Sequence, residues 1–173
     1  IDAANGIESQ DLSIFGLAAK RNKGIVVLVN KWDLVQDKET NTARDFEARL
    51  KQKLAPFNDV PILFISVLEK QRISKAIDLA LEVYENRNRR ITTSVLNEVM
   101  QAAIERTPPP SHRGRFLKIK YITQLPLAYP AFAFFCNYPD HVKENYKNFL
   151  RNKLRENFNF KGVPLTVFFR SKN

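Results

Sequence analysis

The sequence predicts an α/β half followed by a smaller α+β domain, and two observations lead to this division. Between residues 8 and 86, helical patterns alternate with two short apolar runs, in the order typical of a parallel sheet flanked by helices. Beyond the polar segment 87–90 the order changes to helix, two strands, helix and strand. We therefore expect one domain in residues 1–88 and another in residues 89–173.

The first half is expected to alternate helix and strand. Each apolar run follows a turn residue, Gly24 or Pro61, and is short and rich in branched side chains. Such runs are typical of strands that are buried on both faces. The expected elements are a helix at 8–20, a strand at 25–29, a helix at 40–55, a strand at 62–65 and a helix at 74–86.

The second half is expected to form a compact α+β domain. Its first helix has apolar residues along one side and ends before Pro108, because proline cannot continue the helical hydrogen bonds. Gly162 and Pro164 introduce the last strand. The expected elements are a helix at 92–106, strands at 115–123 and 131–138, a helix at 140–157 and a strand at 165–169.

The composition is that of a soluble globular protein, with 44% hydrophobic and 27% charged residues. No apolar run is long enough to cross a membrane and no signal peptide opens the chain, so a cytoplasmic location is expected. The single cysteine, Cys136, cannot form an internal disulfide and is expected in the core. Because the first residue is Ile1, the chain is expected to be part of a longer protein.

The net charge of +10 is concentrated in the second half. Residues 1–90 contain 15 Lys/Arg and 13 Asp/Glu, a net charge of +2, whereas residues 91–173 contain 13 and 5, a net charge of +8. This asymmetry indicates an anionic partner for the second half, most simply nucleic acid.

The segment Asn30-Lys31-Trp32-Asp33 directly follows the first predicted strand. Ligands of open α/β sheets bind beyond the carboxyl ends of strands, so a site is expected here. The Asp33 carboxylate could accept hydrogen bonds from N1–H and the exocyclic amino group of guanine, whereas the N1 lone pair of adenine would repel it. The Asn30 amide could link the base to neighbouring loops, and the methylenes of Lys31 could cover the ring. The alternative is an ordinary polar turn.

This segment resembles the Asn-Lys-x-Asp motif of P-loop GTPases, which implies a bound GTP or GDP. In those proteins a Ser-Ala-x loop after the next strand offers a backbone N–H to guanine. Ser66-Val67-Leu68 is the equivalent here, with Val67 in place of alanine; an ordinary turn is the alternative for Ser66. Residues 1–6 resemble the segment beyond switch II, so the resemblance covers the C-terminal half of a GTPase domain. The chain has no phosphate-loop motif, so the resemblance places the Mg²⁺ ligands and catalytic residues upstream.

The second half resembles the KH-like domain of the Der (EngA) family, bacterial GTPases with two tandem GTPase domains. The resemblance is found in five segments and at Tyr146, and it implies a role in assembly of the large ribosomal subunit. The segments are 107–110, 114–124, 130–139, 149–158 and 162–170. A Gly-x-x-Gly loop, with which ordinary KH domains clamp nucleic acid, is missing.

A row of basic residues, which we call the basic row, recurs every four positions along the predicted 140–157 helix: Lys143, Lys147, Arg151 and Arg155. Contact with ribosomal RNA would relieve the repulsion between these like charges, although a solvated helix face is an equal alternative. Phe132, Phe134 and Phe135 are candidates for base stacking, with core packing as the alternative. Part of this domain's surface could instead contact the upstream GTPase domains of the same chain.

Two functional hypotheses follow. In the first, the chain is a fragment of a GTP-hydrolysing protein of large-subunit ribosome biogenesis; it reads guanine, and alone it is inactive. In the second, it is a non-catalytic RNA-binding module with an α/β scaffold half. Selectivity between guanine and adenine nucleotides distinguishes the two hypotheses.

Overall fold

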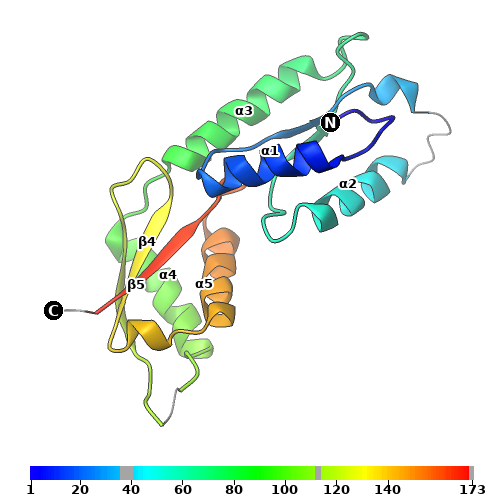
Figure 1. Ribbon diagram of the computed structural model, residues 1–173. Coiled ribbons are helices and arrows are strands. Elements are labelled where there is room, and N and C mark those ends of the chain that lie inside the picture. The colour runs from blue at the N-terminus through cyan, green and yellow to red at the C-terminus, as the bar shows by residue number, and fades with distance from the viewer. Residues whose placement is uncertain (36–40, 112–113, 172–173) are drawn as a thin grey trace. The chain divides into compact units, whose positions relative to one another are not determined.

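A computed structural model describes residues 1–35, 41–111 and 114–171 of the chain. The chain divides into two compact units, shown in Figure 1. Unit 1 comprises Ile1–Arg87 and Lys161–Pro164, and unit 2 comprises Asn88–Phe160 and Leu165–Asn173. The segment Lys161–Pro164 belongs to unit 1, because the Ile25 N–H donates to the Gly162 carbonyl at 2.8 Å and the Gly162 N–H donates to the Asp59 carbonyl at 2.8 Å.

Unit 1 has three α-helices and a two-stranded parallel sheet within the described residues. The strands β1 (Val27–Val29) and β2 (Ile62–Phe64) are paired so that Val29 lies opposite Phe64. The helices are α1 (Ser9–Lys20), α2 (Thr42–Lys53) and α3 (Ile73–Asn88), and the predicted helix start at residue 40 lies outside the described residues. The predicted order of helices and strands is confirmed, and the predicted parallel pairing is confirmed as well.

The strands of unit 1 differ from the prediction in length and burial. β1 begins at Val27 instead of residue 25, and β2 ends at Phe64. Val27 and Val29 are buried in the core of the unit, whereas Leu28, whose side chain alternates to the other face, is only partly buried. The prediction that the first strand is buried on both faces is therefore wrong for the described residues.

Unit 2 contains a three-stranded mixed sheet in the order β3-β4-β5. β3 (Ile119–Gln124) runs antiparallel to β4 (Ala131–Cys136), and β4 runs parallel to β5 (Thr166–Arg170). The helices α4 (Thr93–Arg106) and α5 (Glu144–Asn157) pack with the sheet around one core. The predicted order of elements is confirmed, as is the helix end before Pro108.

Two boundaries in unit 2 were predicted wrongly. The helix predicted at 140–157 begins at Glu144, because Val142 and Lys143 have extended backbones and Pro139–His141 forms a separate 3₁₀ turn, η2. The strand predicted at 115–123 begins at Ile119. Just before it, the Lys118 N–H donates to the Asn137 side chain at 2.9 Å. The Lys118 N–H therefore bonds to a side chain there and not to a carbonyl of the neighbouring strand.

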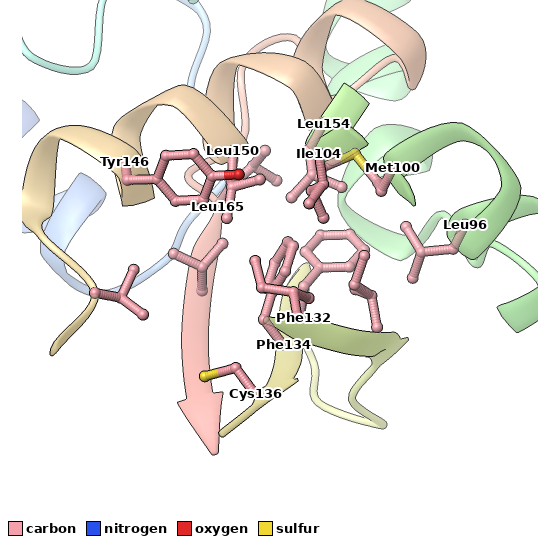
Figure 2. Close-up of a cluster of buried hydrophobic side chains, with 14 of the residues drawn as sticks. Leu96, Met100, Ile104, Phe132, Phe134, Cys136, Tyr146, Leu150, Leu154 and Leu165 are labelled. Carbon is pink, nitrogen blue, oxygen red and sulfur yellow. The ribbon is translucent and has the colours of Figure 1, made fainter. Parts of the chain in front are cut away.

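The core of unit 2 brings together apolar side chains from α4, α5 and the sheet (Figure 2). Phe132 and Phe134 are fully buried in it, so they are core residues and not base-stacking platforms. Cys136 is also buried, and burial raises the pKa of its thiol, which confirms the interpretation as a core residue. Phe135 lies on the opposite face of the sheet and stacks on Tyr121 at a ring distance of 4.3 Å.

Candidate functional site

The two loops that the sequence singles out lie at the same edge of the unit 1 sheet. Because β1 and β2 are parallel, the residues that follow Val29 and Phe64 come together. The Ile65 N–H donates to the Val29 carbonyl at 2.8 Å, and the Trp32 N–H donates to the Ile65 carbonyl at 3.1 Å. The Asn30 Oδ1 accepts a hydrogen bond from the Val67 N–H at 3.1 Å, which joins the first loop directly to the second. The structure thus brings the two predicted motifs into contact.

Trp32 anchors the first loop in the core of unit 1. It begins a 3₁₀ turn, η1 (Trp32–Leu34), and its buried ring lies 4.3 Å from the ring of Phe64 and 5.7 Å from that of Phe46. The residue before it, Lys31, has a φ of 61°, in the left-handed region. That conformation costs about 1–2 kcal/mol for a residue with a side chain, so the anchoring contacts must hold the turn. The motif therefore has a fixed shape.

Asp33 presents an unsatisfied acceptor at this edge. Its Oδ1 is buried and has no hydrogen-bond partner among the described residues. A buried acceptor without a donor costs about 1–3 kcal/mol, and a ligand that brings an N–H to it would remove that cost. This oxygen is therefore a candidate hydrogen-bond acceptor for a ligand.

Lys31 is held by Asp2, a residue that sequence reasoning did not select. Its Nζ lies 2.7 Å from the Asp2 Oδ2. The hydrogen bond from Lys31 lowers the pKa of Asp2, and the same bond raises the pKa of Lys31. Both groups therefore stay ionised at neutral pH. The side chain of Lys31 remains 55% exposed, so its methylenes are accessible to a ligand.

Ser66 shapes the second loop from within. It is fully buried, and its hydroxyl oxygen accepts a hydrogen bond from the Glu69 N–H at 3.1 Å. The Gln71 N–H donates to the Ser66 carbonyl at 2.8 Å, which closes the turn. Arg72, also missed from the sequence, donates from Nη1 to the Phe64 carbonyl at 2.9 Å. Val67 is left 57% exposed, with its backbone N–H donated to Asn30.

The basic row lies in unit 2, and several of its cations already have partners. Lys143 immediately precedes α5 and is exposed. Lys147 and Arg151 lie 3.4 Å and 2.9 Å from the carboxylate of Glu144, and the pKa of Glu144 is lowered chiefly by the hydrogen bond from Arg151. Arg155 donates to the Phe160 carbonyl at 3.1 Å. The row is present, but it is partly neutralised.

Neither a metal cluster nor a membrane-spanning helix is found among the described residues. Within residues 1–35, 41–111 and 114–171, no three His, Cys, Asp or Glu side chains gather in a way that could hold a metal ion. No helix in the described part of the chain has the length and apolar character needed to cross a membrane.

Comparison with known sequence families gives two matches. The family described as "KH-domain-like of EngA bacterial GTPase enzymes, C-terminal" matches residues 90–170. The family described as "Elongation factor Tu GTP binding domain" matches residues 1–109. Together the two matches extend over both units of the chain.

Curated relatives named GTPase Der are similar along the whole chain. The protein from Christiangramia forsetii is 54% identical over 172 residues, those from Flavobacterium psychrophilum and Flavobacterium johnsoniae are 55% and 53% identical, and each alignment covers 99% of this chain. The chain spans only 39% of the length of these relatives. A solved structure of Era with MgGDPNP and part of 16S ribosomal RNA matches 99% of this chain and 63% of that one at 16% identity, but its TM-score of 0.39 is too low to support a structural argument.

Proposed function

Because this chain belongs to the Der (EngA) family of bacterial GTPases, we propose that it supplies the guanine-reading part of a GTP-binding domain and a KH-like domain that contacts ribosomal RNA. The intact protein would hydrolyse GTP with Mg²⁺ in the bacterial cytoplasm, during biogenesis of the large ribosomal subunit. This chain alone would not hydrolyse GTP, because it has no phosphate-loop motif. The Mg²⁺ ligands are proposed to lie upstream, and no residue of this chain is assigned to the metal.

The main support for guanine recognition is the unpaired buried oxygen of Asp33. The carboxylate would accept hydrogen bonds from N1–H and the amino group of guanine. The Val67 N–H would turn towards O6 of the base, and the exchange would release the Asn30 Oδ1 that now accepts it. Lys31 would cover the ring with its methylenes, and Ser66 would hold the loop that presents Val67. Each predicted base-site residue thus receives a separate proposed role.

The full-length protein provides the test, with the affinities of GDP and ADP compared by calorimetry. We expect strong preference for GDP, because adenine presents an acceptor where Asp33 also presents one. Asp33→Asn should weaken GDP binding about 10- to 100-fold and favour xanthosine diphosphate, because an amide can donate to the xanthine oxygen. Asp78→Asn, the same chemical change at an exposed position of α3, is the control. Equal affinity of the unsubstituted protein for GDP and ADP would contradict guanine recognition and favour the hypothesis of a non-catalytic RNA-binding module.

Contact with ribosomal RNA is proposed for the basic row on the strength of the +8 charge of residues 91–173 and the role that family resemblance implies. Lys147→Glu combined with Arg151→Glu should weaken association with purified large ribosomal subunits at low salt. It should also flatten the dependence of affinity on salt, because fewer counterions are released on binding. Lys23→Glu combined with Lys75→Glu makes the same charge change at exposed positions of unit 1. If both double variants behave alike, the basic row is only a solvated helix face.

A further inference from the structure

We propose that Asp2 is a positioning residue for nucleotide binding, which tethers the ammonium group of Lys31 so that the lysine methylenes lie ready to cover the purine ring. This inference rests on the proposed guanine site. It adds to that site a residue that lies 28 positions before Asn30 in the sequence and outside both loops that the sequence singled out.

The backbone of Asp2 is fixed beside the first loop. Asp2 forms a parallel bridge with Asn30. The Asn30 N–H donates to the Ile1 carbonyl at 2.9 Å, and the Ala3 N–H donates to the Asn30 carbonyl at 2.9 Å. These bonds set the distance between Asp2 and the base-reading loop before any side chain is considered.

The carboxylate of Asp2 is fixed as well. Its Oδ1 accepts a hydrogen bond from the Ala4 N–H at 2.9 Å, while its Oδ2 faces Lys31 at 2.7 Å. The turn that follows is closed by the Gly6 N–H, which donates to the Asp2 carbonyl at 2.9 Å. Gly6 has a φ of 73°, a conformation that glycine adopts without steric cost. The Asp2 carboxylate is thus held in one orientation beside Lys31.

Lys31 is consequently held at both ends. Its backbone lies between Asn30, which is bonded to Ile1, and Trp32, which is bonded to Ile65. Its ammonium is bound by Asp2. A free lysine side chain has one of the largest rotamer entropies of any residue, and a ligand that orders it must overcome that entropy. The tether restricts the stem in advance, while 55% of the side chain remains exposed to contact a ring.

The tether also keeps two groups of the motif apart. Lys31 and Asp33 are two residues apart in the sequence, and a lysine that turned towards Asp33 would compete with guanine for its carboxylate. With the ammonium held by Asp2, the buried Oδ1 of Asp33 stays without a partner among the described residues. Since exposed ion pairs contribute little to folding stability, we expect the pair to matter for ligand affinity more than for stability.

The experiment measures the Kd of GDP for the full-length protein with Asp2→Asn. An asparagine oxygen can still accept from Ala4, so the turn is retained while the charge is removed. We expect GDP binding to weaken about 3- to 10-fold, the cost of ordering one flexible side chain, with the melting temperature unchanged. Asp2→Glu should restore part of the loss. Asp78→Asn is again the matched control on an exposed surface.

A double-mutant cycle with Lys31→Met separates positioning from other effects. If Asp2 acts through Lys31, Asp2→Asn should have no further effect once Lys31 is methionine. In the Asp33→Asn variant, adding Asp2→Asn should weaken binding of xanthosine diphosphate by the same factor, because the Lys31 methylenes would cover either ring. The same loss in both Lys31 backgrounds, or no loss in a protein that prefers GDP to ADP, would overturn the positioning role alone. Equal affinity for GDP and ADP in the unsubstituted protein would overturn the guanine site and this inference together.

Discussion

The sheet edge of unit 1 and the basic row of unit 2 were both predicted from the sequence as ligand sites. In the structure they differ in whether their charged groups already have partners. At the edge, hydrogen bonds fix the backbone while Asp33 keeps a buried oxygen without a partner in the described chain. Along α5, Lys147 and Arg151 are already paired with the single carboxylate of Glu144. Placement after a strand thus identified a carboxylate with an oxygen unpaired in the described chain, whereas periodic charge identified a helix face with cations that are already paired.

The two regions belong to units with separate hydrophobic cores, so a large defect in one core should spare the other function. Phe132→Ala removes a fully buried ring from unit 2 and should destabilise that unit by about 3–5 kcal/mol. Denaturant unfolding of the full-length protein would measure the loss. The affinity for GDP should remain unchanged.

The matched control for this variant is Phe116→Ala, because Phe116 is 83% exposed and its removal should change stability by no more than about 0.5 kcal/mol. A loss of GDP affinity in Phe132→Ala equal to its loss of stability would show that the edge depends on the core of unit 2. The two regions would then not be independent of one another.

The edge can be tested through the bond that joins its two loops. Asn30→Ala removes the acceptor of the Val67 N–H and the amide that would face the base. We expect GDP binding to weaken about 10- to 100-fold, which corresponds to about 1–3 kcal/mol for a lost hydrogen-bonding group. Asn41→Ala is the control, because the side chain of Asn41 makes no capping hydrogen bond at the start of α2. Similar affinities for the two variants would mean that the bond between the loops does not shape the site.

The sequence predicted the order of elements and the two loops that meet at one edge of the unit 1 sheet, because strand runs and the loops after them are local signals. It missed Asp2 and Arg72, since their roles depend on neighbours that only the folded sheet brings close. Asp2 lies beside Lys31 because it forms a bridge with Asn30, and Arg72 reaches back to the carbonyl of Phe64. No spacing within either motif indicates those contacts.

The errors in unit 2 have a similar origin. The apolar pattern of the 140–157 segment continues through Val142, which is buried, so periodicity alone extended the helix too far. The backbone at Val142 and Lys143 is extended, and Val142 packs in the core, so tertiary packing overrides the local helical pattern here. Glu144 was visible in the sequence, but Arg151 lies seven residues later, about two helical turns, and so outside the pairing that a four-residue repeat suggests.

The pH dependence of unit 2 provides a smaller test on its core. Burial raises the pKa of Tyr146 to about 12, and its hydroxyl donates to the Thr107 carbonyl at 2.8 Å. The unfolded chain releases this proton near pH 10, so the stabilising effect is complete below pH 10 and is lost between about pH 10 and 12. Tyr146→Phe should flatten the fall of stability in that window, as measured by denaturant unfolding at several pH values. Tyr84→Phe, at a side chain that is 65% exposed, should leave the slope unchanged.

The smallest expected effect concerns the neutralising carboxylate of the basic row. Glu144→Gln should release Lys147 and Arg151 for an anionic partner, because it removes the charge that now binds both. Exposed pairs of this kind contribute a few tenths of a kcal/mol, so the affinity for large ribosomal subunits should rise only about twofold. The dependence of affinity on salt should become steeper, since more cations would replace counterions on the RNA.

The control for Glu144→Gln removes the same charge from α4, where Glu105 is exposed. A general gain in positive charge would make Glu105→Gln raise the affinity equally, whereas a contact through the basic row predicts a larger rise for Glu144→Gln. Because the hydrogen bond from Arg151 lowers the pKa of Glu144, the carboxylate stays ionised at neutral pH, and the difference should narrow only as acid protonates it. An affinity that is independent of Glu144 at neutral pH would mean that Lys147 and Arg151 do not face the RNA. In that case, the edge of unit 1 would remain as the proposed ligand site, and the basic row would be a solvated helix face.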